Sequence, residues 1–158
     1  MDKLGQATLK AEVAADCEVL ANAVAVARER LGQGSAPQLE ACAFHLVRAY
    51  NAIEQMGLRI AKAFENHIDD ERGWHTELIH RLCLAITGVR PRFFPRELTP
   101  DLMELRGFRH LIVHAYDVNL RKDRTVGVLE AAERIANRLP TLIETFFAQL
   151  STEQRGGG

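Results

Sequence analysis

Five residues within a short stretch of the chain combine positive charge, proton transfer and hydrogen bonding: Arg106, Arg109, His110, His114 and Tyr116. Histidine both takes and gives protons near neutrality, because its unperturbed pKa is about 6.5. Arginine stays charged and presents a planar fork of donors that matches phosphate oxygens. Such residues suit cleavage of RNA without a metal, in which a base and an acid move protons and a cation stabilises the crowded phosphorane.

The same residues have less specific interpretations. His110 and His114 stand four positions apart, a spacing that can also bind a metal ion. No third ligand follows them in the pattern of a zinc protease, so we expect no metal and no other cofactor. A helical arginine and histidine are otherwise a solvated pair or a packing contact, and Tyr116 is otherwise an aromatic anchor at the end of a core stripe.

The spacing Arg109-x4-His114-x-Tyr116 resembles the Arg-x4-His-x-Tyr signature of HepT toxins, which are ribonucleases of the HEPN superfamily. The resemblance covers residues 36 to 150. It includes further segments that look like parts of HepT-like sequences: Tyr50 to Glu54, Trp74 to Leu78, Arg90-Pro91 and Phe108 to His110. The fold it implies is all-α, an up-and-down four-helix bundle with an additional short helix.

The resemblance implies a role for each matching residue. Arg109 would bind and stabilise the scissile phosphate, His114 would act as general acid or base, and Tyr116 would help to position RNA. Many HEPN proteins carry a small polar residue where this chain has His110. We assign His110 and Arg106 to substrate binding, and the sequence leaves open whether His110 takes part in proton transfer or only packs.

The resemblance also implies partners. HepT toxins of type VII toxin–antitoxin systems are silenced by a nucleotidyltransferase antitoxin of the MntA type, which attaches AMP to the motif tyrosine, here Tyr116. The added phosphate and nucleoside would exclude RNA by like-charge repulsion and by bulk. HEPN nucleases resemble one another in forming dimers whose motifs face a common groove. We therefore expect a homodimer that cleaves RNA, with structured RNA such as tRNA as a candidate substrate.

Two other functions fit the same helical chain. One is a noncatalytic HEPN partner that binds nucleotide or RNA beside a nucleotidyltransferase. The other is a structural interaction bundle in which the motif is coincidental. Geometry also limits the nuclease interpretation, because a straight helix places Tyr116 on the face of Arg109 but His114 about 140° away from it. The length of the arginine, fraying near Tyr116 or a second subunit must close that gap.

The elements that carry these residues follow from hydrophobic periodicity. Apolar residues recur every three or four positions, which is the spacing of one helical face. Ser35 and Thr99 are the expected N-caps of two helices, each with a proline in its first turn. Pro140 should kink or divide the last helix. The helices expected from this pattern span residues 9–31, 37–64, 74–86, 99–115 and 124–150.

The passage from Val89 to Arg96 contains two prolines and should form an irregular loop. Its three arginines, at positions 90, 92 and 96, either contact an RNA backbone or belong to a solvated turn. The remaining histidines, at positions 45, 67, 75 and 80, are expected to be structural or simply exposed.

Composition sets the outer limits. A chain of 158 residues with 47% hydrophobic and 26% charged side chains is that of a folded protein, and we expect one domain over 1–152 and a flexible tail over 153–158. Neither a long apolar run nor a signal peptide is evident, so a cytoplasmic location without membrane association is expected. The net charge of -1 excludes a strongly basic coat protein, although residues 88–124 hold eight basic against five acidic side chains. The three cysteines should be free thiols.

Overall fold

The computed structural model describes residues 1–65 and 74–156, with the backbone alone for 74–76 and 153–156. These residues form five α-helices and one short 3₁₀ helix: α1 (Lys3–Leu31), α2 (Ala36–Glu65), α3 (Trp74–Leu82), η1 (Arg96–Leu98), α4 (Thr99–Val113) and α5 (Lys122–Gly156). No strand forms among them, and a single isolated bridge joins Ile86 to Arg90. The predicted all-α class is confirmed.

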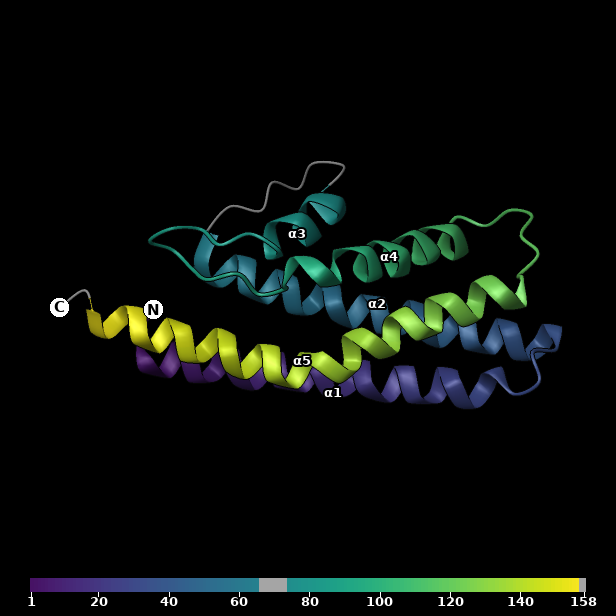
Figure 1. Ribbon diagram of the computed structural model, residues 1–158, viewed down its shortest axis with the longest axis horizontal. Coiled ribbons are helices and arrows are strands. Elements are labelled where there is room, and N and C mark those ends of the chain that lie inside the picture. The colour runs from purple at the N-terminus through teal and green to yellow at the C-terminus, as the bar shows by residue number, and fades with distance from the viewer. Residues whose placement is uncertain (66–73, 157–158) are drawn as a thin grey trace.

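The four long helices run alternately in opposite directions along the molecule (Figure 1). α2 packs against α1, α3, α4 and α5, and α5 also packs against α1 and α4. The four long helices are α1, α2, α4 and α5. The short helix α3 precedes α4 along the same side of α2, so together they complete the bundle (Figure 1). This arrangement is the predicted up-and-down four-helix bundle with an additional short helix.

Local sequence explains the sharp turn between α1 and α2. Gly32 and Gly34 adopt positive φ angles of 48° and 77°, which glycine tolerates without steric cost. The backbone N–H of Ser35 donates to Oε1 of Gln38 at 3.0 Å, so the third residue of α2 reaches back to the residue before the helix. Pro37 lies in the first helical turn, as expected.

The predicted end of α3 is wrong. The helix stops at Leu82, and the predicted continuation to Ile86 does not form. The backbone N–H groups of Phe93 and Phe94 both donate to the carbonyl of Leu82, at 3.0 Å each. The chain therefore turns back on the helix end four residues before the position that periodicity suggests.

Both predicted ends of α4 also need correction. Leu98, at the end of η1, precedes the helix, and the Thr99 hydroxyl donates to Sγ of Cys83 at 3.5 Å, so Thr99 is not the N-cap. At the other end, α4 stops at Val113 and His114 is its C-cap. Ala115 is therefore exposed and does not extend the inner stripe.

α5 is one continuous helix that contains Pro140. Figure 1 shows that α5 bends about midway along its length, which agrees with the missing N–H donor of a proline. The helix continues to Gly156, and residues 157 and 158 lie outside the described residues. The division into a domain over 1–152 and a flexible tail over 153–158 stays an expectation.

The first turns of α1 and the last turns of α5 lie at the same end of the bundle (Figure 1). Two contacts join them: Gln6 Nε2 donates to Ser151 Oγ at 3.4 Å, and Lys10 pairs with Glu144 at 2.8 Å. The connection between α4 and α5 lies at the opposite end (Figure 1).

One hydrophobic core joins all five helices. Near the end of α2, aromatic rings fix the loop that precedes α4: the ring centroid of Phe146 in α5 lies 5.2 Å from that of Phe93 and 6.1 Å from that of Phe64.

Cys17, Cys42 and Cys83 are buried free thiols, as predicted. Burial raises the pKa of Cys42 to about 11, so this thiol behaves as a small hydrophobic group. None of the described helices combines the length and apolar character that crossing a bilayer requires.

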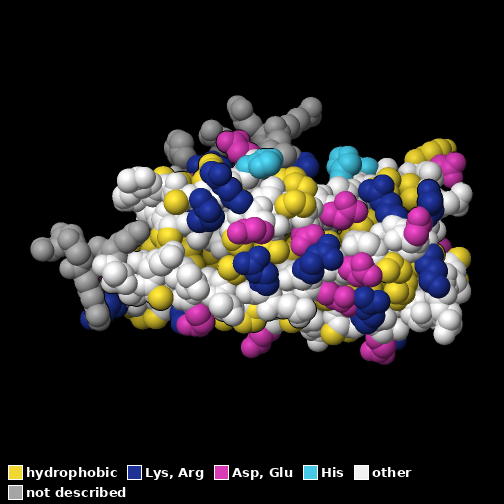
Figure 2. Space-filling model, in the orientation of Figure 1, with side chains coloured by type: hydrophobic (Ala, Val, Ile, Leu, Met, Phe, Trp, Pro, Cys, Tyr) yellow, Lys and Arg dark blue, Asp and Glu magenta, His cyan; other side chains and the backbone are white. Residues whose placement is uncertain are grey.

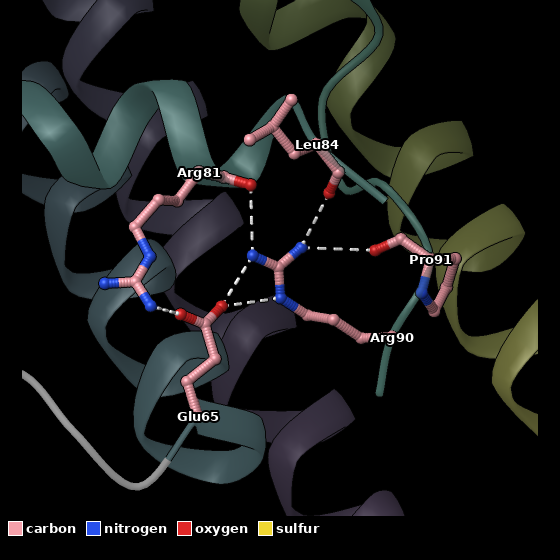
Figure 3. A network of polar contacts seen from close by, with 5 residues as sticks. All are labelled: Glu65, Arg81, Leu84, Arg90 and Pro91. Atoms are coloured by element: carbon pink, nitrogen blue, oxygen red, sulfur yellow. Dashed lines mark hydrogen bonds and ion pairs between the residues drawn. The ribbon is translucent and has the colours of Figure 1, made fainter. Parts of the chain in front are cut away.

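Arg90 is the main polar residue of the interior, with 2% of its surface exposed. Figure 3 shows its guanidinium turned toward Glu65 at the end of α2, and Nε and Nη2 donate to Oε1 of that carboxylate at 2.9 and 2.6 Å. Nη2 and Nη1 also donate to the carbonyls of Arg81 and Leu84, both at 3.0 Å. Arg81 pairs with the other carboxylate oxygen of Glu65.

This network changes the interpretation of the basic loop. Arg90 caps the end of α3 and anchors the loop to α2, so it is not available to an RNA backbone. Arg92 and Arg96 are exposed, and for them contact with an RNA backbone and a place in a solvated turn stay the two predictions.

Replacing Arg90 by methionine should destabilise the fold by about 3–5 kcal/mol, because the change leaves buried carbonyls and part of a buried carboxylate without their donor. Denaturant unfolding measures this loss. The matched control is Arg92→Met, an exposed position at which a change within about 0.5 kcal/mol is expected. Equal free energies of unfolding for the two variants would show that the network does not stabilise the loop.

Candidate functional site

The motif residues lie at the C-terminal half of α4 and at the start of the connection to α5. α4 packs against both α2 and α5, which leaves one face of its last turns open to solvent. Figure 2 shows histidine side chains at two points along the edge formed by α3 and α4, with basic and acidic side chains interspersed around them. The exposed histidines of these two helices are His80, His110 and His114.

Two residues of α2 hold Arg109 in place. Its Nε donates to Oδ1 of Asn51 at 3.1 Å, and its guanidinium carbon lies 5.9 Å from the centroid of the Tyr50 ring. This is a cation–π contact combined with a directional hydrogen bond. The two terminal nitrogens of Arg109 form no hydrogen bond within the described residues, so the half-buried guanidinium keeps donors for a phosphate.

Beneath Arg109 lies a polar layer at the interface of α2 and α4. Tyr50 is completely buried, and its pKa is raised by burial first and then by the negative charge of Glu54. The positive charges of Arg106 and Arg109 act in the opposite direction on that pKa. Arg106 is half-buried and belongs to this layer, and its assignment to substrate binding remains a prediction.

His110 and His114 lie against each other on the outer face of α4. Their ring centroids are 4.5 Å apart and the ring planes are inclined by 46°. Both side chains are exposed. The backbone N–H of His114 donates to the carbonyl of His110 at 3.1 Å, so the last turn of the helix sets the separation of the two residues.

The structure brings these two histidines together but forms no hydrogen bond or ring contact between Arg109 and His114 in the part of the chain that it describes. Arg109 is directed to α2, whereas both imidazoles face solvent. The angular gap expected from helix geometry is therefore present. Although α4 ends before Tyr116, this helix end does not bring Arg109 and His114 together.

Tyr116 is fully exposed and lies in the connection between α4 and α5. The alternative that it anchors the end of a core stripe is wrong, because α4 ends before it. For the same reason Tyr116 does not share a helical face with Arg109. Its side chain forms no hydrogen bond or ring contact with any other described residue, and it is accessible to a partner from every side.

Sequence reasoning missed the residues of α2 that complete the site. The signal was present, since Tyr50 to Glu54 belong to the segments that resemble HepT sequences, but no role followed from it. Also in α2, Phe44 is 61% exposed, and its ring centroid lies 5.1 Å from that of His45. Arg48 Nη1 lies 3.0 Å from Nδ1 of His45. Burial and the nearby charge of Arg48 lower the pKa of His45.

The other histidines agree with a structural or exposed role where they are described: His45 is half-buried and His80 is exposed. His67 and the side chain of His75 lie outside the described residues. Among the residues that the structure covers, no group of three histidine, cysteine, aspartate or glutamate side chains forms that could hold a metal ion.

A family model described as "HepT-like protein" matches residues 41–150, which is well over half of the chain. The chain belongs to the HepT-like family of the HEPN superfamily. No curated protein and no solved structure matches it. The matched range of this HepT-like protein begins inside α2 and includes Tyr50, Asn51 and the whole of α4, so it contains both walls of the site.

HepT-like proteins of the HEPN superfamily are generally ribonucleases, and HepT toxins typically pair with a nucleotidyltransferase antitoxin. In this HepT-like chain α1 lies outside the matched range. It nevertheless packs against α2 and α5, and α2 carries the two residues that contact Arg109.

Replacing Asn51 by alanine should release the guanidinium of Arg109. A hydrogen bond to a charged group contributes about 1.5 kcal/mol, so exchange of the Arg109 Nε proton with water should become roughly tenfold faster. NMR of ¹⁵N-labelled protein measures that rate, with the resonance identified by its loss in Arg109→Lys. Asn51→Asp retains an acceptor and should preserve the protection. Unchanged exchange in the alanine variant would disprove this anchoring.

Proposed function

We propose that this HepT-like protein is the toxin component of a toxin–antitoxin system and a metal-independent endoribonuclease. The observation that carries the proposal is the placement of Arg109: two residues of α2 fix its guanidinium while its terminal nitrogens stay available, and the same helix carries an exposed histidine pair. Membership of the HepT-like family supports the same activity.

In the proposed reaction Arg109 binds the non-bridging oxygens of the scissile phosphate and stabilises the charge that develops on them. The 2′-hydroxyl of the preceding ribose attacks phosphorus, the bond to the 5′-oxygen breaks, and His114 transfers a proton. The products are a 2′,3′-cyclic phosphate and a 5′-hydroxyl. Because Arg109 and His114 face different directions in one chain, we further propose a homodimer in which the two motifs share a groove.

The proposed antitoxin is a nucleotidyltransferase of the MntA type that acts on Tyr116. The phenolic oxygen attacks the α-phosphorus of ATP, pyrophosphate leaves, and the tyrosine retains AMP. Full exposure of Tyr116 supports this role, since the enzyme must surround the side chain that it modifies. The added negative charge, two residues from His114, would repel an RNA phosphate. Both the RNA substrate and the antitoxin suggest that the protein acts in the cytoplasm.

Induced expression of the wild type should arrest growth and fragment cellular RNA, whereas Arg109→Ala and His114→Ala should do neither. Loss of a general acid or base lowers the rate by about 10²–10⁴-fold, which is enough to abolish toxicity. Growth curves and the end groups of total RNA measure the effect. His80→Ala removes an exposed histidine from α3 and serves as the control that stays toxic. Intact RNA with all four soluble proteins would favour the noncatalytic binding function.

Tyr116→Phe should remain toxic but escape the antitoxin, because it keeps the ring and removes the oxygen that accepts AMP. Intact-mass measurement after co-expression with the antitoxin should show one AMP on the wild type and none on this variant. The chain has two tyrosines, and the other, Tyr50, is buried, so Tyr50→Phe should still be modified. A mass increase on Tyr116→Phe would place the modification elsewhere.

A further inference from the structure

His110 and His114 form a ring contact that the proposed function does not use. The ring centroids lie 4.5 Å apart on the exposed side of α4, where neither ring is needed to fill the core. The backbone hydrogen bond between the same two residues holds them in register at the last turn of the helix. The helix therefore places the two imidazoles side by side on one exposed face.

The position of His110 on the helix gives this pair a direction. At about 100° per residue, His110 lies about 100° from Arg109 and His114 lies about 140° from it in the same sense. His110 is thus between the two residues of the motif. Around the helix, His110 is therefore nearer to Arg109 than His114 is.

The chemistry of RNA cleavage needs two proton-transfer groups at the same moment. One must accept the proton of the attacking 2′-hydroxyl, and another must give a proton to the departing 5′-oxygen. Imidazole can act as an acid or as a base near neutrality. Two imidazoles in contact therefore provide both kinds of group at one place.

We propose that His110 is a second catalytic residue, which divides the roles of acid and base with His114; this inference rests on the proposed ribonuclease function. The neutral imidazole takes the 2′-hydroxyl proton as the new bond to phosphorus forms. The protonated imidazole gives its proton to the 5′-oxygen as the old bond breaks. The pair holds the same number of protons before and after the reaction, and only their places are exchanged.

The test uses full-length protein and a synthetic RNA hairpin that contains a bond cleaved by the wild type, made once with the natural 5′-oxygen and once with sulfur in its place. A sulfur leaving group needs no acid. With the oxygen substrate, His110→Ala and His114→Ala should each lose about 10²-fold or more in rate. With the sulfur substrate, the variant that lacks the acid should recover to within about tenfold of the wild type, and the variant that lacks the base should not.

His110→Phe is the matched control, because it keeps an aromatic ring against His114 and cannot transfer a proton. It should be as impaired as His110→Ala on the oxygen substrate. Retention of wild-type rates by His110→Phe, or an equal loss by both alanine variants on the two substrates, would overturn the division of roles. Absence of cleavage by the wild type on any RNA would instead refute the ribonuclease function itself.

Discussion

The packing of α4 against α2 determines how the motif arginine is oriented, because this residue of α4 is held by side chains of α2. Arg109 belongs to α4, but its orientation is set by Tyr50 and Asn51 of α2. α2 in turn packs against every other α-helix, so these contacts together set the position of the surface on which the guanidinium rests. α1, which lies outside the family match, supports the site through its packing against α2 and α5.

Hydrophobic periodicity predicted the five helices well because burial of a 3.6-residue stripe is a local property of the sequence. Periodicity failed to place the helix ends where residues distant in the sequence form hydrogen bonds with groups at those ends. Leu82 ends α3 because Phe93 and Phe94 donate to its carbonyl, and Thr99 turns to Cys83 although its sequence context is that of an N-cap. Neither competitor can be recognised from the residues beside the helix end.

The site divides in the same way. Residue type and spacing selected the arginine, the two histidines and the tyrosine as candidates, because their chemistry is a property of each side chain. The partner of Arg109 could not be predicted, since Asn51 is 58 positions away. The basic loop illustrates the opposite error: composition treats Arg90, Arg92 and Arg96 alike, yet the first is buried against Glu65 and the other two are exposed. The direction in which a side chain points depends on the residues that pack around it. The sequence of the loop alone does not show which residues those are.

The placement of the two chain ends has a practical consequence for tethering. The first turn of α1 and the last turns of α5 lie together at the end of the bundle opposite the connection between α4 and α5 (Figure 1), and this connection contains Tyr116. A helix the length of α5, with 35 residues at about 1.5 Å each, separates them from the connection that carries this tyrosine. A fluorescent or affinity domain fused to either end would therefore leave the motif unobstructed. An antitoxin fused there would need a linker of about 50 Å to reach its target.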